Sequence, residues 1–402
     1  MKSGRDGRSG RDGRNGKEEV RGRTHLRLFV LIDALGWKFL EGREFLNQVL
    51  PYRNPLRTVL GFSSGAIPTI LTGLTPAQTG HWNLLYYDPV GSPFGWFRHF
   101  TFLPRAILDQ RVTRKILKEI GRHFLGLGKN FDCAVSPRVL PLFNWVERGN
   151  IYESGGIGAT RSIFDELKTQ GTAYRVYSYH RWTDAQILER AERELAAGVA
   201  DFFFVYLSEL DQFLHDQWAR PEPVNERLQW YAAHLQRLFQ IARDRDPQVT
   251  LAIFSDHGMT PVRERRNLVA EVDGLGFSMP EDYLAVYDST MARFWFRREE
   301  SRKRIGERLR QLPYGRVLPE AELKELGVFF ADGRYGETVF LLDPGCLIAN
   351  SNFNGPQWVP AGMHGYHPDD PYSDAVFLSN RQFNFPVSTI ADVYRVMREG
   401  AA

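Results

Sequence analysis

The sequence predicts an α/β fold in which helices flank both faces of a doubly wound, mostly parallel sheet. Short apolar runs at residues 26–32, 202–207 and 249–254 are each followed closely by acidic residues. This pattern is typical of strands that are buried on both faces and end in a polar loop. Apolar residues at helical spacing lie between the second and third runs, at 225–243. Strands that alternate with helices predict a parallel sheet, and ligands bind such sheets beyond the carboxyl ends of the strands.

The other elements of this domain continue the alternation of strands and helices. Residues 173–179 predict a further strand. Thr183 and Gln186 have the spacing of a capping box, so we expect a helix to begin there and to extend to Gly198. Farther upstream, a short helix is expected at residues 66–71, directly after a Gly-Phe-Ser-Ser-Gly segment.

A segment rich in aromatic residues and Arg, residues 84–160, interrupts this alternation. Within it, residues 104–129 predict a basic amphipathic helix. Residues 105–129 hold seven Lys or Arg against two Asp or Glu, a net charge of +5. One interpretation is a solvated helix face, and the other is contact with a membrane surface or an anionic substrate.

Residues 262–350 form the second interruption, which we predict to be an inserted α+β cap. Its elements are an alternating strand at 283–296, a charged helix at 301–312 and a strand at 338–342. The main domain then comprises residues 25–261, which include the aromatic insertion, and residues 351–402.

The composition of the chain excludes several classes of protein. With 402 residues, of which 43% are hydrophobic and 25% charged, the chain is not mostly disordered, collagen-like or a disulfide scaffold. The net charge of +3 arises in residues 1–23. These hold eight Lys or Arg and four Asp or Glu, which leaves 43 basic and 44 acidic residues elsewhere, a net of −1. We therefore expect no specific nucleic-acid partner.

Residues 1–24 are rich in Gly and Arg and predict a disordered tail, because they hold too few apolar residues to build a core. A solvated leader is one interpretation, and a basic arm for RNA, anionic lipid or a partner is the other. The tail lacks the apolar region of a secretory signal, and the chain has no run long enough for a transmembrane helix. A cytoplasmic location is therefore expected, with peripheral membrane contact as an open alternative.

Side chains of the types that bind metals concentrate in five short motifs. These contain Asp33, Ser63 with Ser64, Asp211 with His215, Asp256 with His257, and His364. Asp and His suit zinc, and six such ligands are enough for two sites with open positions. Similar sites accept manganese. Two neighbouring cations can stabilise the attacking and the leaving oxygen of a displacement at phosphorus, and a Ser beside them becomes a usable nucleophile.

The order of these motifs resembles the alkaline phosphatase superfamily, and within it the type I phosphodiesterase/nucleotide pyrophosphatase branch. The segments that carry the resemblance are Thr72-Gly73-Leu74-Thr75-Pro76, Asn83-Leu84-Leu85-Tyr86-Tyr87-Asp88-Pro89, Ser255-Asp256-His257-Gly258-Met259 and His364-Gly365-Tyr366. The resemblance spans residues 28–88, 202–260 and 360–395. It implies an alkaline phosphatase-like core.

By position, the resemblance also implies roles for single residues. It implies one zinc site formed by Asp211, His215 and His364, and a second formed by Asp33, Ser63, Asp256 and His257. It places the nucleophile nine residues before Thr72, at Ser63, and implies that Asn83 hydrogen-bonds a phosphate oxygen. The branch has Phe-Pro-Asn after its nucleophile, where this chain has Ser64-Gly65-Ala66, so Ser64 is retained as an alternative nucleophile.

The expected activity is hydrolysis of a phosphodiester or pyrophosphate bond. Ser63 attacks phosphorus, and water then hydrolyses the phosphoserine, with the help of two divalent cations, zinc or alternatively manganese. The substrate is expected to be small and phosphorylated: a nucleotide, a nucleotide sugar or another phosphodiester. A phosphomonoesterase or phosphomutase of the same superfamily is an alternative, and a non-catalytic binding module on the same scaffold is a further one.

Overall fold

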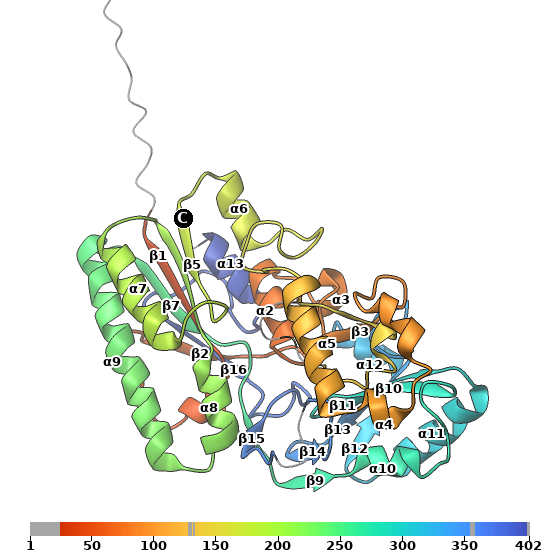
Figure 1. Ribbon diagram of the computed structural model, residues 1–402. Helices are drawn as coiled ribbons and strands as arrows, with labels where there is room; N and C mark the ends of the chain where they lie inside the picture. Colours follow the sequence, from red (N-terminus) through yellow and green to blue (C-terminus); the bar gives the residue numbers. More distant parts are fainter. Residues whose placement is uncertain (1–24, 128–130, 132, 354–357, 400–402) are drawn as a thin grey trace, which may run out of the picture.

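The computed structural model describes residues 25–127, 131, 133–353 and 358–399, so the predicted tail at 1–24 lies outside the described residues. The described residues contain a central six-stranded sheet of order β2-β16-β7-β1-β6-β5 (Figure 1). Its strands are β1 (Arg27–Ile32), β2 (Tyr52–Leu56), β5 (Tyr174–Tyr177), β6 (Phe202–Leu207), β7 (Thr250–Phe254) and β16 (Ala375–Ser379).

The pairing of these strands is mostly parallel. Strand β1 lies between β7 and β6 and runs parallel to both, and β5 runs parallel to β6. Strand β16 is antiparallel to β7 and to β2 at one side of the sheet. The predicted α/β class with a mostly parallel sheet is therefore confirmed.

Helices cover both faces of the central sheet, as a doubly wound fold requires. One face carries α1 (Trp37–Leu40), α7 (Asp184–Ala196), α8 (Glu209–Gln217) and α9 (Pro221–Arg245), and the other carries α2 (Ser63–Thr72), α6 (Ile163–Thr169) and α13 (Asp392–Glu399). Alternate side chains of β1 point to opposite faces of the sheet. Val30 packs against the helices of the first face and Phe29 against those of the second. Each such fully buried side chain contributes about 1.5–3 kcal/mol through burial.

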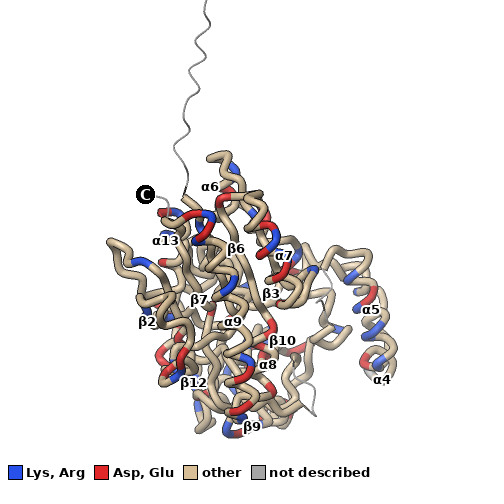
Figure 2. The backbone as a smooth tube through the Cα atoms, turned by 90° about the vertical axis from the view of Figure 1, so that its left-hand side faces the viewer, with Lys and Arg blue, Asp and Glu red and all other residues tan. Residues whose placement is uncertain are grey.

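The aromatic insertion packs around a core of its own, to which residues 284, 286 and 295 also contribute. It contains β3 (Leu85–Tyr87) paired with β4 (Phe143–Trp145), the 3₁₀ turns η1 (Gly95–Phe100) and η2 (Leu140–Leu142), and the helices α4 (Arg105–Leu108) and α5 (Arg111–Phe124). A short helix α3 (Pro76–Thr79) precedes it. Figure 2 shows α4 and α5 at one edge of the molecule.

The prediction of one helix over residues 104–129 was wrong, because the helix is interrupted between α4 and α5. Gln110 has extended backbone angles, and the Thr113 side chain donates to the carbonyl of Ile107 across the break. Gly126, which has a φ of +68°, follows soon after the end of α5. Apolar spacing continues across both short helices, so the sequence pattern does not reveal the interruption.

The segment predicted as a cap contains an antiparallel sheet of order β10-β11-β13-β12. Its strands are β10 (Tyr283–Tyr287), β11 (Met291–Phe296), β12 (Gly315–Val317) and β13 (Thr338–Leu342), and its helices are α10 (Leu268–Asp273), α11 (Glu299–Gln311) and α12 (Glu320–Glu325). The short pairs β8 (Thr260–Pro261) with β15 (Gly362–Met363) and β9 (Glu264–Arg266) with β14 (Cys346–Ile348) lie where the chain enters and leaves this segment. Its exact boundaries stay a prediction.

The single strand predicted at residues 283–296 is instead a hairpin of β10 and β11. The polar residues 288–290 form its turn, where the Asp288 carboxylate accepts a 2.7 Å hydrogen bond from Arg293 of the returning strand. Both strands are almost entirely apolar and buried, so the apolar run continues on both sides of the turn. No helix in the described part of the chain is long and apolar enough to span a bilayer.

Candidate active site

The candidate site begins at the carboxyl ends of three adjacent strands. Asp33 follows β1, Asp256 follows β7, and Asp211 lies in the first turn of α8, directly after β6. Because β7, β1 and β6 are parallel neighbours, their ends meet at one edge of the sheet. The strand order thus brings together carboxylates that lie far apart in the sequence.

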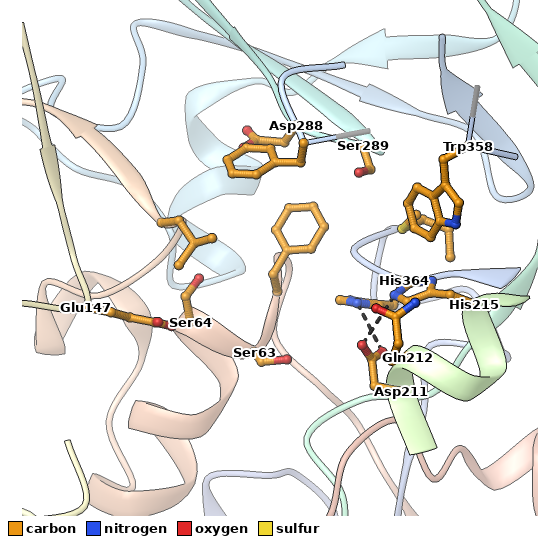
Figure 3. A pocket seen from close by; sticks show the side chains of 14 residues that line it. Ser63, Ser64, Glu147, Asp211, Gln212, His215, Asp288, Ser289, Trp358 and His364 are labelled. Atoms are coloured by element: carbon orange, nitrogen blue, oxygen red, sulfur yellow. Dashed lines mark ion pairs between the residues drawn. The ribbon is translucent and has the colours of Figure 1, made fainter. Parts of the chain in front are cut away.

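A cavity of about 430 Å³ opens beside this edge (Figure 3). Ser63, Asp211, His215 and His364 line its floor, and Asp288 and Ser289 from the turn between β10 and β11 lie across from them. Glu147 and Ser64 lie at the end away from the histidines. The cavity therefore lies between the main domain, the aromatic insertion and the antiparallel sheet.

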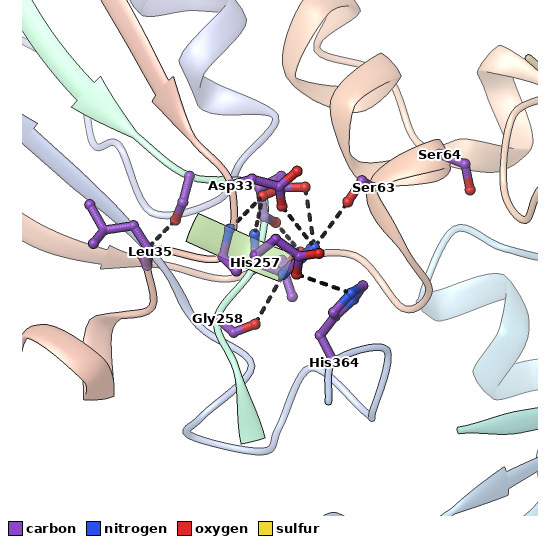
Figure 4. Close-up of polar contacts among 12 residues, drawn as sticks. Asp33, Leu35, Ser63, Ser64, His257, Gly258 and His364 are labelled. Carbon is purple, nitrogen blue, oxygen red and sulfur yellow. Dashed lines mark hydrogen bonds and ion pairs between the residues drawn. The ribbon is translucent and has the colours of Figure 1, made fainter. Parts of the chain in front are cut away.

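Ser63 and Ser64 differ in their surroundings. The Ser63 oxygen lies 3.0 Å from Nε2 of His257, whereas the Ser64 hydroxyl donates a 2.7 Å hydrogen bond to the buried carbonyl of Trp82 (Figure 4). Helix α2 begins at Ser63, three residues before the expected start, so both lie in its first turn. Only Ser63 faces the His and Asp side chains, which favours it as the nucleophile.

Asp211, His215 and His364 form the first group of metal-type ligands. Asp211 Oδ2 lies 3.3 Å from Nε2 of His215, and Asp211 Oδ1 lies 3.4 Å from Nε2 of His364. Nδ1 of His215 donates to the carbonyl of Gly362 at 2.8 Å, which fixes the tautomer and leaves the Nε2 lone pair toward the group.

Asp33 and Asp256 form a second cluster around His257, the residue that Ser63 contacts. Nε2 of His257 lies 3.5 Å from Asp33 Oδ1 and 3.3 Å from Asp256 Oδ2. Nδ1 of His257 donates to the carbonyl of Gly258 at 2.9 Å, so its Nε2 carries a lone pair that can accept a hydrogen bond from Ser63 or bind a cation. The Tyr206 hydroxyl donates to Asp33 Oδ2 and holds that carboxylate in place.

The two clusters are contiguous. The rings of His257 and His364 stack with centroids 3.8 Å apart. Ligand atoms of Asp33, Asp211 and His257 also form a compact group of their own, within 4.8 Å of one another. Asp211 therefore belongs to two groups of metal-type ligands, one with His215 and His364 and the other with Asp33 and His257. We expect the loss of Asp211 to affect both groups.

The electrostatics of the site fit bound cations. Burial, together with the nearby Asp256 and Asp211, raises the pKa of Asp33 well above its ordinary value. Burial and the adjacent His257 lower the pKa of His364. Burial opposes ionisation of Asp211 too, but His215 and His364 together hold its pKa below the ordinary value.

Several buried ligand atoms also accept no hydrogen bond from a described residue: Asp33 Oδ1, Asp211 Oδ1, Asp256 Oδ2 and His364 Nδ1. Clustered buried carboxylates without compensation are costly, and divalent cations would supply the missing charge. The residues present therefore fit a site for such cations.

Two glycines allow the backbone to reach this geometry. A Cβ on Gly258 would lie 2.1 Å from the carbonyl oxygen of Tyr372, so only Gly fits after His257. Gly365 has a φ of +91°, and a Cβ there would meet the Phe62 ring at 2.7 Å. The Gly that follows each of the two stacked histidines is therefore required by packing.

Comparison with known proteins shows the family of the chain and supports the assignment of the fold. A sequence model described as "Type I phosphodiesterase / nucleotide pyrophosphatase" matches residues 62–367, about three quarters of the chain. The chain belongs to this family. It is therefore a hydrolase of the phosphodiesterase and pyrophosphatase type. A comparison with curated proteins finds no match.

Solved structures of the same family are similar throughout the fold. Human ectonucleotide pyrophosphatase/phosphodiesterase 5 aligns with a TM-score of 0.66 at 14% identity and covers 93% of this chain and 94% of its own. The murine protein gives 0.65 at 16%, covering 94% and 96%. An inactive variant of the murine protein in complex with AMP gives 0.64 at 17%, covering 93% and 94%. The alkaline phosphatase-like core is therefore confirmed.

Asn83 is the predicted site residue for which the structure shows neither a place in the cavity wall nor a contact with the Asp and His ligands. Its side chain is fully buried, with Nδ2 at 3.5 Å from the sulfur of Met291 and Oδ1 without a described partner. It is not among the described residues that line the cavity. The phosphate contact that the family resemblance implies for Asn83 stays a prediction.

Sequence reasoning missed most of the cavity wall. Glu147, Asp288, Phe353 and Trp358 all line the cavity, and each comes from a loop outside the ligand motifs. Asp288 has a detectable signal, because the polar residues 288–290 interrupt an apolar run and so indicate a turn. The other three have no such signal, since only the fold brings their loops to the site.

Glu147 gives the site a group that titrates near neutrality, because burial raises its pKa from 4.5 to about 7. The folded state then binds this proton more tightly than the unfolded chain does, so the stabilisation is complete below pH 4.5 and lost as the pH rises through 7. We expect Glu147→Gln to raise the free energy of unfolding at pH 8 by up to about 3 kcal/mol, with little change at pH 4.

Urea unfolding at the two pH values measures this difference between wild type and variant. Glu153→Gln, at an exposed position of the same insertion, is the matched control for the exchange of a carboxylate for an amide. If Glu147→Gln changed the free energy of unfolding equally at both pH values, the raised pKa of Glu147 would be contradicted.

Proposed function

We propose that the protein hydrolyses a phosphodiester or pyrophosphate bond through a covalent phosphoserine at Ser63. The observation that carries the proposal is the position of the Ser63 oxygen, 3.0 Å from Nε2 of His257 and at the border of two contiguous groups of Asp and His ligands. The family membership supports the type of bond.

The proposed cofactors are two divalent cations, with zinc favoured over manganese because three of the ligands are histidines. Asp211, His215 and His364 would hold one, and Asp33, Asp256 and His257 with Ser63 the other. When bound, such cations neutralise phosphate charge and lower the pKa of a hydroxyl beside them. The Asp211 carboxylate in the cavity wall favours bound cations, because it would otherwise repel an anionic substrate.

The proposed steps assign the following roles to residues of the chain. The Ser63 hydroxyl gives up its proton, and its oxygen forms a bond to phosphorus as the bond to the leaving oxygen breaks. The leaving oxygen takes the electron pair and a proton. Water then attacks the phosphoserine and releases the second product and free Ser63. The amino end of α2, where Ser63 lies, favours the negative charge of the phosphoryl group.

A nucleotide-type substrate is the proposed class. The cavity of about 430 Å³ is large enough for a mononucleotide-sized group, and Phe62, Phe353 and Trp358 provide apolar surface for a planar base. The AMP complex of the murine relative supports the same class.

The test compares the rates at which the protein, supplied with zinc or manganese, hydrolyses different substrates. We expect bis-nitrophenyl phosphate and a dinucleotide or nucleotide sugar to be hydrolysed faster than nitrophenyl phosphate. Chelation should abolish the activity, and about two equivalents of cation per chain should restore it. Faster turnover of the monoester would contradict the proposed bond specificity, and full activity after complete metal removal would contradict the proposed cofactors.

A further inference from the structure

Exposed apolar side chains concentrate in one segment of this protein. Eleven large hydrophobic residues are exposed in the described part of the chain, and eight of them lie within residues 90–124. They are Val90, Trp96, Phe100, Phe102, Ile107, Val112, Ile116 and Phe124. Phe102 and Phe124 are 81% and 82% exposed, which is unusual for Phe. Such a concentration of apolar surface marks an interaction site.

The same segment is strongly basic. Residues 95–124 hold seven Lys or Arg against two Asp or Glu, a net charge of +5, whereas the chain beyond residue 23 has a net of −1. Figure 2 shows the basic positions along α5 at the edge of the molecule. The positive charge and the exposed apolar side chains therefore lie on the same elements.

Helix α5 shows how the two features combine. One side packs into the protein through Leu117 and Gly121. The other side exposes Val112 and Ile116, four residues apart, and Arg111 and Lys115 beside them, also four apart. Arg111 and Lys115 form no ion pair with a described residue. An exposed helix face with adjacent apolar and basic rows matches the interfacial helices that lie in the plane of a membrane surface.

We propose that η1, α4 and α5 form a docking surface for an anionic lipid bilayer, here called the 95–124 surface. Its Phe, Ile and Val side chains enter the boundary between headgroups and acyl chains, and its Arg and Lys side chains bind anionic headgroups. Each basic residue near such a bilayer strengthens binding by roughly fivefold. This proposal does not depend on the proposed chemistry of the active site.

The charge of the 95–124 surface disfavours a second copy of the chain as its occupant. A symmetric dimer would place the same patch on both sides of the contact, and two patches of net charge +5 would repel each other. A nucleic acid would match the charge but would leave the exposed Phe and Ile side chains without an apolar partner. An anionic bilayer offers negative headgroups to the basic side chains and an apolar interior to the Phe, Ile and Val side chains.

The test is vesicle flotation of the full-length protein. We expect binding to phosphatidylcholine vesicles that contain about one third phosphatidylserine, and weak binding to phosphatidylcholine alone. High salt should reduce the binding without abolishing it, because only the ionic part is screened. Absence of binding to the anionic vesicles at low salt would overturn the proposal.

Two double variants separate the contributions. Arg111→Glu with Lys115→Glu should lower binding to anionic vesicles by roughly tenfold or more, and Ile116→Ser with Phe124→Ser should make the remaining binding fully sensitive to salt. Hydrolysis of a small soluble diester should be unchanged in both, which shows that they fold.

The matched control for charge is Lys168→Glu with Arg193→Glu, exposed positions on α6 and α7, and Val199→Ser is the control for apolar surface. Equal binding by the α5 variants and these controls would overturn the proposal. A second result would also overturn the proposal: the wild type is a dimer, Phe124→Ser dissociates it, and neither protein binds vesicles. That result would assign the surface to a second copy of the chain.

Discussion

Ser63→Ala is expected to lower kcat for a phosphodiester by at least about three orders of magnitude, because it removes the atom that forms the covalent bond to phosphorus. The fold should survive, since Ser63 is partly exposed at the start of α2 and makes its side-chain contact only with His257 among the described residues. Steady-state kinetics and a melting curve on the same preparation measure both quantities.

Ser64→Ala is the matched control for this substitution. Its hydroxyl donates to the carbonyl of Trp82 and is turned away from His257, so its loss should lower kcat by no more than about tenfold. Its effect should fall mainly on stability, by about 1 kcal/mol through the lost buried hydrogen bond. If Ser64→Ala were the inactive variant, the assignment of the nucleophile would be wrong by one residue.

Asp211→Asn is expected to have the second largest effect, a loss of about two to four orders of magnitude in kcat/KM. Asp211 is the only residue found in both groups of metal-type ligands among the described residues, so a neutral amide at this position weakens both. Because binding of cations depends on the charge of the ligands, the metal content of the purified variant should fall along with the rate.

Asp216→Asn provides the matched comparison on the same helix, because its exposed carboxylate accepts a hydrogen bond from Trp358 and belongs to neither group. It should retain the metal content of the wild type. The melting temperature of the metal-free Asp211→Asn variant should stay within a few degrees of that of the metal-free wild type. This corresponds to a change of roughly 1 kcal/mol in the free energy of unfolding. Unchanged metal content and rate in Asp211→Asn would contradict the assigned role.

The main sheet could be predicted from the sequence because its strands are buried on both faces. Runs such as 202–207 are uniformly apolar and are followed by polar loops, and β6 matches that run residue for residue. The hairpin of β10 and β11 resembles one strand in the sequence because both of its strands are apolar runs with β-type residues, and only three polar residues separate them. The break between α4 and α5 was missed for the same reason, since helical spacing continues across Gln110.

The ligand motifs could be predicted for a related physical reason. Asp33, Asp211 and Asp256 directly follow buried strands, and parallel neighbours bring such residues to one edge. The cavity walls depend instead on how the insertions fold back over that edge. Glu147 and Trp358 lie in irregular segments after β4 and before β15, where no periodic pattern indicates the direction of the chain.

The covalent intermediate provides the most direct test of the central claim. The metal-loaded protein would be mixed with bis-nitrophenyl phosphate, quenched in acid within one turnover, digested and analysed by mass spectrometry. We predict a nitrophenyl phosphoryl group on Ser63, formed with the release of one equivalent of nitrophenol and absent in Ser63→Ala. A label on Ser64, or complete turnover with no labelled serine at any quench time, would contradict the account.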